Sequence, residues 1–375
     1  MFEPVLAFGV GSVFGLVLDK AHNNIPASII TQMNMTNFTM MRMFLAASSA
    51  SALVILALHK LGIKERSSKG GLALGFNLFG GYGANLVGGM VLGVGLYLSG
   101  ACPGTVFAML GANVPYAWLT FVGGIVGTVL FGYMDKHIRA SNEKFHVRHE
   151  PATSDLALKL GVPFEVASVG FLAVCLGGLV AFDKYMPWED GQAQLIAKPD
   201  HGRPLFDLTA KSWDPMVCGF LLGMLQLPVK LFTGYAIGQS SGYVKIASQV
   251  TNFIDSNLHI NSPYLHRSLN DKYDAFQVFS GLGIMFGAAL SNYLAGEPDL
   301  TSLAANGCGG PVRAFIGGVV MLLGARFAGG CASGHGISGM ATLSAGSVVS
   351  VCGMFMGGIL CSLIEGNFMQ PLTVL

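Results

Sequence analysis

Long apolar segments separated by polar stretches run through the whole chain. Nine of them could cross or enter a bilayer, at residues 4–19, 40–59, 71–100, 115–134, 157–182, 214–236, 276–295, 313–330 and 340–364. A run of about 20 apolar residues spans the hydrocarbon core of a membrane as a helix. The pattern therefore predicts an all-α polytopic membrane protein with about nine transmembrane helices.

The composition indicates that most of the chain is surrounded by lipid. Of 375 residues, 52% are hydrophobic and 11% are charged, whereas charged residues make up roughly a quarter of a soluble domain. The net charge of +1 and the lack of a basic tract argue against a nucleic-acid partner. The 52 glycines, about twice the usual share, indicate close helix packing, interrupted helices, or both.

Two polar stretches interrupt the apolar pattern. The stretch at 183–212 predicts an extramembrane linker, which divides the chain into a first membrane repeat at 1–182 and a second at 213–375. Another polar stretch, at about 251–274, lies within the second repeat. Residues 1–20 have neither a basic start nor a clear cleavage site, so we interpret them as the first mature helix rather than a signal peptide.

The two halves share a sequence repeat. Adding 229 to residues 88–102 places "GGMVLGVGLYLSGAC" on "GGVVMLLGARFAGGC" without a gap, and six of fifteen positions are identical, ending in Cys102 and Cys331. With a five-residue insertion, "FVGGI" at 121–125 then meets "FMGGI" at 355–359. Repeats of this kind are common in transporters, whose substrate sites lie at the repeat interface.

Loop charges favour inverted over parallel repeats. Loops 60–70 and 135–150 each hold four Lys or Arg residues, whereas loop 296–311 and the C-terminal tail hold none. Basic loops face the cytoplasm. Corresponding loops of the two halves are therefore expected on opposite sides of the membrane, as an inverted repeat requires.

Both repeat cysteines lie where the apolar pattern is broken. "SGACPGT" and "AGGCASGHGISG" surround them with helix-interrupting glycines, namely Gly100, Gly104, Gly330, Gly334 and Gly336. In inverted repeats, such broken helices enter from opposite faces and present free N–H groups that attract anions. We therefore expect both thiols on one central path. The alternative is that paired small residues pack at the symmetry axis.

A second pair of breaks offers uncharged polar groups. Asn23 and Asn24 interrupt the first apolar segment, and Gln239, Ser240 and Ser241 occupy the matching place in the second half. Polar groups at membrane depth usually face an interior path. We therefore take these five residues as candidates for substrate binding, although they would also serve as caps of short helices.

Two basic residues accompany Cys331. His335 follows it by four residues and would polarise the thiol, donate to an anion, or satisfy backbone carbonyls. Arg326 lies in an apolar run, either to attract an anion or to anchor the helix by reaching the membrane surface. Because a thiol is a soft, polarizable group, this setting favours a sulfur-bearing substrate over sulfate or phosphate.

No enzyme motif is recognisable, and neither a metal nor a cofactor is expected. The segments "SGACPGT", "GARFAGGCASGHGISG" and "GQSSG" resemble the YeeE/YedE sulphur-transport family over nearly the whole chain. The resemblance implies a thiosulfate permease of the cytoplasmic membrane, built as an hourglass-like bundle of inverted repeats with short re-entrant broken helices. It also implies a relay of S–H···S contacts between Cys102 and Cys331 without large rocking motions, lined by His335, Ser240 and Ser241.

Members of that family can carry a further cysteine near the first break, where this chain has Asn23 or Asn24. Two other functions fit the same residues. A membrane thiol oxidoreductase would need a reactive thiolate pair or a quinone site, and a passive anion channel would admit chloride or sulfate as readily as thiosulfate. The expected partners are the sulfur anion and the lipid bilayer, with a cytoplasmic sulfur-accepting protein as a further candidate.

Overall fold

The computed structural model describes residues 2–63, 82–144, 156–195, 206–296 and 309–370. These ranges are helical, without a strand, and hold eight helical segments long and apolar enough to cross a membrane. The segments are α1 (Phe2–Lys20), α3 (Thr39–Lys60), α6 (Ala117–Lys144), α8 (Phe164–Tyr185), α10 (Pro215–Met224) with α11 (Gln226–Thr233), α15 (Lys272–Leu294), α17 (Pro311–Ala328) and α18 (Ala345–Ile364). The predicted all-α, polytopic architecture is confirmed.

Shorter helices join these spans. One of them, α4 (Gly83–Ser99), is apolar and has 17 residues, which accounts for the ninth predicted segment. The others are α2 (Pro26–Met33), α5 (Thr105–Gly111), α7 (Leu156–Leu160), α9 (Trp188–Leu195), α12 (Ser240–Ile254), α13 (Leu258–Asn261), α14 (Pro263–Ser268) and the π-helix η1 (Gly334–Gly339).

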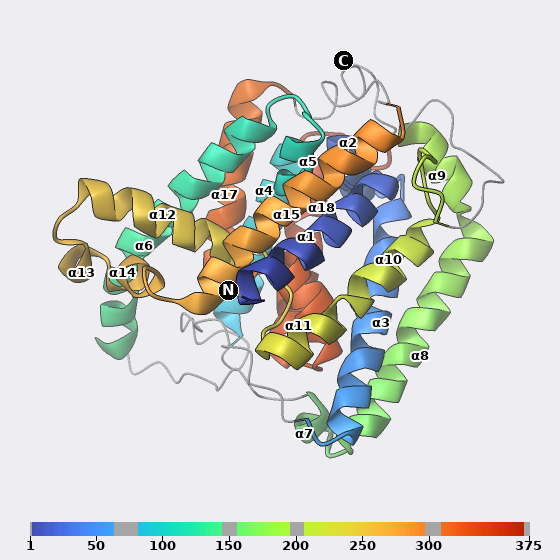
Figure 1. Cartoon of the computed structure of the whole chain (residues 1–375), viewed down its shortest axis with the longest axis horizontal. Coiled ribbons are helices and arrows are strands. Elements are labelled where there is room, and N and C mark those ends of the chain that lie inside the picture. The colour runs from blue at the N-terminus through green and yellow to red at the C-terminus, as the bar shows by residue number, and fades with distance from the viewer. Residues whose placement is uncertain (1, 64–81, 145–155, 196–205, 297–308, 371–375) are drawn as a thin grey trace.

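The polar stretches of the sequence contain short helices in their described parts. The linker at 183–212 contains α9, and the stretch at 251–274 contains α13 and α14. In Figure 1, α12, α13 and α14 form one edge, while α8 lies at the opposite edge beside α3. Large parts of the loops used to orient the halves, at 64–81, 145–155 and 297–308, lie outside the described residues.

A seam of glycines joins α4 and α17. A Cβ added to any of four glycines would overlap the facing helix: Gly88 faces Ala328, Gly95 faces Met321, Gly317 faces Ser99 and Gly324 faces Leu92. Residue numbers rise along α4 as they fall along α17, so the two helices run antiparallel. Small residues allow membrane helices to approach this closely.

The other long helices pack mainly on helices of the opposite half. Helix α1 packs on α15, α3 packs on α10, α6 packs on α17, and α18 packs on α4. Among the candidate spans that the structure describes, α8 is the exception, since it packs on α3 of its own half and few of its residues are buried. The core is therefore built between the two halves of the chain rather than within each half.

Helices α4 and α17 end in the same way. Gly100 and Gly329 follow them with φ angles of 59° and 82°, a left-handed conformation that glycine adopts at little cost. The chain then passes through Cys102 into α5, and through Cys331 into η1. The left-handed glycine thus lies two residues before the cysteine in both breaks. Gly104, which follows Cys102, has φ −80° and is not left-handed.

Candidate functional site

The two cysteine-bearing breaks approach each other at the start of α12. Gly104 lies beside the side chain of Gln239, and Gly334 lies beside Gly238. Cys102 and Cys331 are both buried and close enough for electrostatic interaction between their thiols. The first turns of α12 therefore lie between two thiols that come from interrupted helices of opposite halves.

Tyr243 of α12 connects the two breaks. Its hydroxyl donates to the Pro103 carbonyl at 3.3 Å, and its ring is buried within electrostatic range of both Cys102 and Cys331. Sequence reasoning missed this residue because nothing local distinguishes a tyrosine in a membrane helix from an ordinary packing residue. Its position depends on a contact between segments 140 residues apart.

Cys102 is held by its own turn. The Thr105 amide donates to the Cys102 sulfur at 3.3 Å, and the Cys102 amide donates to Thr105 Oγ1 at 2.6 Å. Hydroxyl groups commonly close short turns and helix starts in this way. The sequence analysis did not single out Thr105. The signal for such a turn was present, because a threonine follows the cysteine by three residues, directly after Pro-Gly.

Cys102 lines a small cavity of about 40 Å³. Its accessible wall is almost wholly apolar, although four residues with polar groups lie along it: Asn23, Cys102, Thr105 and Ser333. Because Ser333 belongs to the break that carries Cys331, the cavity touches both breaks. A space of this size holds one or a few water-sized molecules, so its scale suits a small inorganic ion and not a large organic solute.

Cys331 is surrounded by hydrogen-bonding groups. Its sulfur lies 3.2 Å from Ser333 Oγ, and the Ser240 hydroxyl and the backbone amides of Gln239 and Gly334 lie close enough to interact with it. Ser240 in turn accepts a hydrogen bond from the guanidinium of Arg326. The second thiol thus lies close to a cation, whereas the first has neutral hydrogen-bond partners.

The five predicted polar residues take different positions. Asn23 lines the cavity and Asn24 donates to Asp19 Oδ1 at 2.6 Å. In the other break, Gln239 and Ser240 contact Cys331, and the Ser241 amide donates to Gln277 Oε1 at 2.8 Å. The structure therefore brings Asn23, Gln239 and Ser240 to the thiols.

His335 uses both ring nitrogens within the protein. Nε2 lies 3.2 Å from the Ala328 carbonyl, which only accepts, so Nε2 is the donor. Nδ1 bonds with the Ser347 hydroxyl at 3.0 Å. The His335 ring also packs on Gly330, where an added Cβ would overlap it. In the same way, an added Cβ at Gly336 would overlap the ring of Phe44. Of the three roles considered from the sequence, satisfaction of a backbone carbonyl fits this geometry best.

Arg326 points into the protein rather than toward its surface. Its side chain is buried and donates to Ser240 Oγ and to the Tyr264 hydroxyl. Its place between α12, α14 and α17 fits the anion-attracting alternative. Among the described residues, no group of three or more His, Cys, Asp or Glu could hold a metal ion.

A family model described as sulphur transport matches residues 24–360, which include both breaks and the polar start of α12. The chain belongs to this family, the YeeE/YedE family. It is therefore a multi-pass membrane transporter of a sulfur compound, and the family implies a sulfur anion as substrate. A transporter family agrees with the expectation that the protein is not an enzyme. No curated protein matches the chain.

Proposed function

We propose that this protein is a permease of the cytoplasmic membrane that takes up thiosulfate, or a closely related inorganic sulfur anion, along a path past Cys102 and Cys331. The observation that carries the proposal is the approach of the two thiols, one from each interrupted helix, beside a small cavity that touches both breaks. Neither thiol lies on the lipid-facing surface, because both side chains are buried.

We interpret the two halves as inverted repeats around this path. In the sequence match, Gly317 is the counterpart of Gly88, and Ala328 is the counterpart of Ser99. The contacts are reciprocal, since Gly88 faces Ala328 while Gly317 faces Ser99. Equivalent helices that pack antiparallel with reciprocal contacts support a twofold axis perpendicular to them, in the plane of the membrane.

In the proposed mechanism the anion moves between the thiols without forming a covalent bond. Each S–H group donates weakly to the soft terminal sulfur of thiosulfate, and the anion leaves chemically unchanged. Weak contacts suit transport, because a tightly held anion would be released slowly. Asn23 lies along the cavity and donates its amide to the Met43 sulfur, and the family resemblance implies that related proteins can carry a third cysteine near this position.

Uptake of radiolabelled thiosulfate by a sulfur-auxotrophic bacterial host tests the proposal. Cys102→Ala and Cys331→Ala should each reduce uptake to background, while the protein level in the membrane stays unchanged. Cys352→Ala is the matched control, because Cys352 is exposed on α18 and should be dispensable. Wild-type uptake by both break variants would overturn the path past the thiols.

The same host separates the proposal from the two alternatives. Excess chloride or sulfate should leave thiosulfate uptake largely unchanged, whereas an unselective anion channel would lose uptake to either ion. A thiol oxidoreductase would accumulate and cycle a disulfide between Cys102 and Cys331 under mild oxidant, detectable by mass spectrometry of the intact protein. The permease should work with both thiols reduced.

A further inference from the structure

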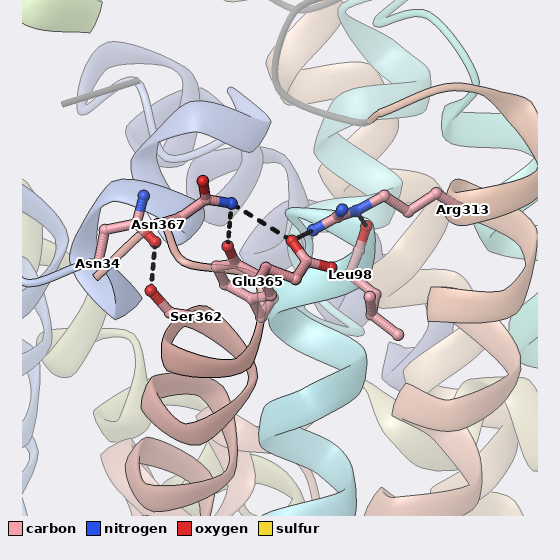
Figure 2. A network of polar contacts seen from close by, with 7 residues as sticks. Asn34, Leu98, Arg313, Ser362, Glu365 and Asn367 are labelled. Carbon is pink, nitrogen blue, oxygen red and sulfur yellow. Dashed lines mark hydrogen bonds and ion pairs between the residues drawn. The ribbon is translucent and has the colours of Figure 1, made fainter. Parts of the chain in front are cut away.

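Helix α17 carries two arginines in contrasting surroundings. Arg313, near its start, forms an ion pair with Glu365 at 2.9 Å and donates to the Leu98 carbonyl at 3.3 Å (Figure 2). Arg326, in its last turn, donates to the Ser240 and Tyr264 hydroxyls. Within the part of the chain that the structure describes, no carboxylate lies within ion-pair distance of Arg326.

The guanidinium of Arg326 is incompletely satisfied. The residue is only 7% exposed, and its Nε has no hydrogen-bond partner. A buried charge without a counter-charge is costly, and proteins retain one where a partner compensates it. Asp274 is the acid that faces this region, and its carboxylate accepts from the Ser268 hydroxyl at 2.6 Å. A bound anion would complete the coordination of Arg326.

The fold itself does not require a cation at this position. In the sequence match, the counterpart of Arg326 in α4 is Tyr97. Tyr97 is buried and neutral, and its hydroxyl accepts a hydrogen bond from Asn367 at 3.0 Å. Because equivalent helix positions hold a tyrosine in one half and an arginine in the other, the arginine marks a difference in function between the two sides of the path.

The side that holds Arg326 is also the more open one. Gly330 and Gly334, which lie on either side of Cys331 in the chain, and Asp274, which faces Arg326, are partly exposed, whereas every residue from 99 to 105 around Cys102 is buried. An anion that reaches Cys331 from this side is also within electrostatic range of Arg326.

We propose that Arg326, Tyr264 and Ser240 form an anion-binding station beside Cys331, which holds the oxygen end of a sulfur oxyanion while its terminal sulfur faces the thiol. This inference rests on the proposed function and deepens it. Ser240 lies between the two parts of the station, because it accepts a hydrogen bond from Arg326 and its hydroxyl is close to the Cys331 thiol. Guanidinium groups bind oxyanions through several N–H donors, and a thiol suits a soft sulfur atom.

The two-part station makes a prediction about selectivity. Thiosulfate offers hard oxygens at one end and a soft sulfur at the other, so it engages both parts. Sulfate offers oxygens alone, and hydrogen sulfide offers a soft sulfur alone. Thiosulfate should therefore bind most tightly, and sulfate should compete only weakly.

Equilibrium binding of radiolabelled thiosulfate to the purified full-length protein in detergent tests the station. Arg326→Gln should weaken binding by about tenfold or more, which is the loss expected for a charge-assisted contact, and Arg326→Lys should be intermediate. Arg313→Gln is the matched control, because it changes the same helix at an arginine already paired with Glu365. It should bind thiosulfate as the wild type does.

Tyr264→Phe keeps the test decisive if Arg326→Gln does not fold, which thermal unfolding will show. It removes one hydroxyl donor from the station and should weaken thiosulfate binding about threefold, the loss of a neutral hydrogen bond. Cys331→Ser should lower the affinity for thiosulfate toward that for sulfate. Wild-type affinity in the folded Arg326 and Tyr264 variants would overturn the station.

The outcomes also separate this inference from the proposed function. Loss of uptake in the cysteine variants, combined with wild-type binding by Arg326→Gln, would leave the thiol path standing and refute the station. Loss of binding in Arg326→Gln, combined with normal uptake by both cysteine variants, would support the station and refute the thiol path.

Discussion

The side-chain amide of Asn23 donates a hydrogen bond to the sulfur of Met43 at 2.9 Å. On its other side, the Ser28 hydroxyl donates to Asn23 Oδ1 at 2.7 Å. These two contacts fix the orientation of the amide, with its NH₂ group toward Met43, which lines the same cavity as Cys102. The amide is therefore held at the cavity wall by contacts within the protein, and we expect an anion on the proposed path to pass close to it.

Asn23→Asp should abolish thiosulfate uptake. The substitution keeps the size of the side chain but replaces the donor with a carboxylate oxygen, which repels an anion. Ser28→Ala should act more mildly, by raising KM with little change in kcat, because it only releases the amide oxygen. Ser12→Ala is the control, since that hydroxyl bonds to the Phe8 carbonyl on an exposed part of α1. Normal uptake by Asn23→Asp would exclude Asn23 from the path.

The glycine seam predicts a large effect of a single methyl group. In Gly95→Ala the added Cβ would overlap the backbone of Met321, so α4 and α17 must separate. We expect a loss of about 1–3 kcal/mol in unfolding free energy, as for other overpacked sites. Gly9→Ala on α1 has no atom within 4 Å of the new Cβ and should be neutral or slightly stabilising. Denaturant unfolding in detergent compares the two.

The turn at Gly100 combines two constraints that can be separated. Its φ is 59°, and an added Cβ would also meet Pro26 of α2. Gly62 has φ 71° with open space around it, so Gly62→Ala should report the left-handed strain alone, about 1–2 kcal/mol. Gly100→Ala should cost more and should also reduce uptake, because it displaces the segment that carries Cys102. Equal losses of stability would show that the Pro26 contact is unimportant.

The sequence specified the spans and the two thiols because both depend on local patterns. A run of apolar residues predicts a membrane helix by its length alone, and the gapless repeat singled out Cys102 and Cys331 among seven cysteines. The partners of these thiols depend on distant contacts. The hydrogen bond from Arg326 to Ser240 joins residues 86 positions apart. The hydrogen bond from Tyr243 to Pro103 joins residues 140 positions apart.

His335 shows the limit of motif reasoning from the other direction. Its spacing from Cys331 indicated a role on the path, yet its ring nitrogens bond to Ala328 and Ser347. A histidine near a functional residue has several acceptors within reach, and only the tertiary structure shows which of them it uses. The sequence therefore could not decide between a role of His335 on the path and a role in satisfying a backbone carbonyl.

Asp255, which lies outside the candidate spans, gives a prediction about pH. Hydrogen bonds from Asn261 and Tyr133 hold the pKa of its carboxyl below the ordinary value of 3.8. The folded state therefore favours the ionised form, and this stabilisation is present above pH 3.8 and lost as the pH falls through the folded pKa. The difference in melting temperature between wild type and Asp255→Asn should be constant near neutral pH and shrink in acid. A difference that grows in acid would contradict this assignment.

The packing of first-half helices on second-half helices has a consequence for biosynthesis. Helices α1, α3 and α6 leave the ribosome first, but their main packing partners α15, α10 and α17 are translated later. Until those helices arrive, the small-residue faces of the early helices meet lipid instead of protein. The newly made protein should therefore mature only after α10, α15 and α17 have been translated, and a nascent chain truncated before α15 should be a substrate for membrane quality control.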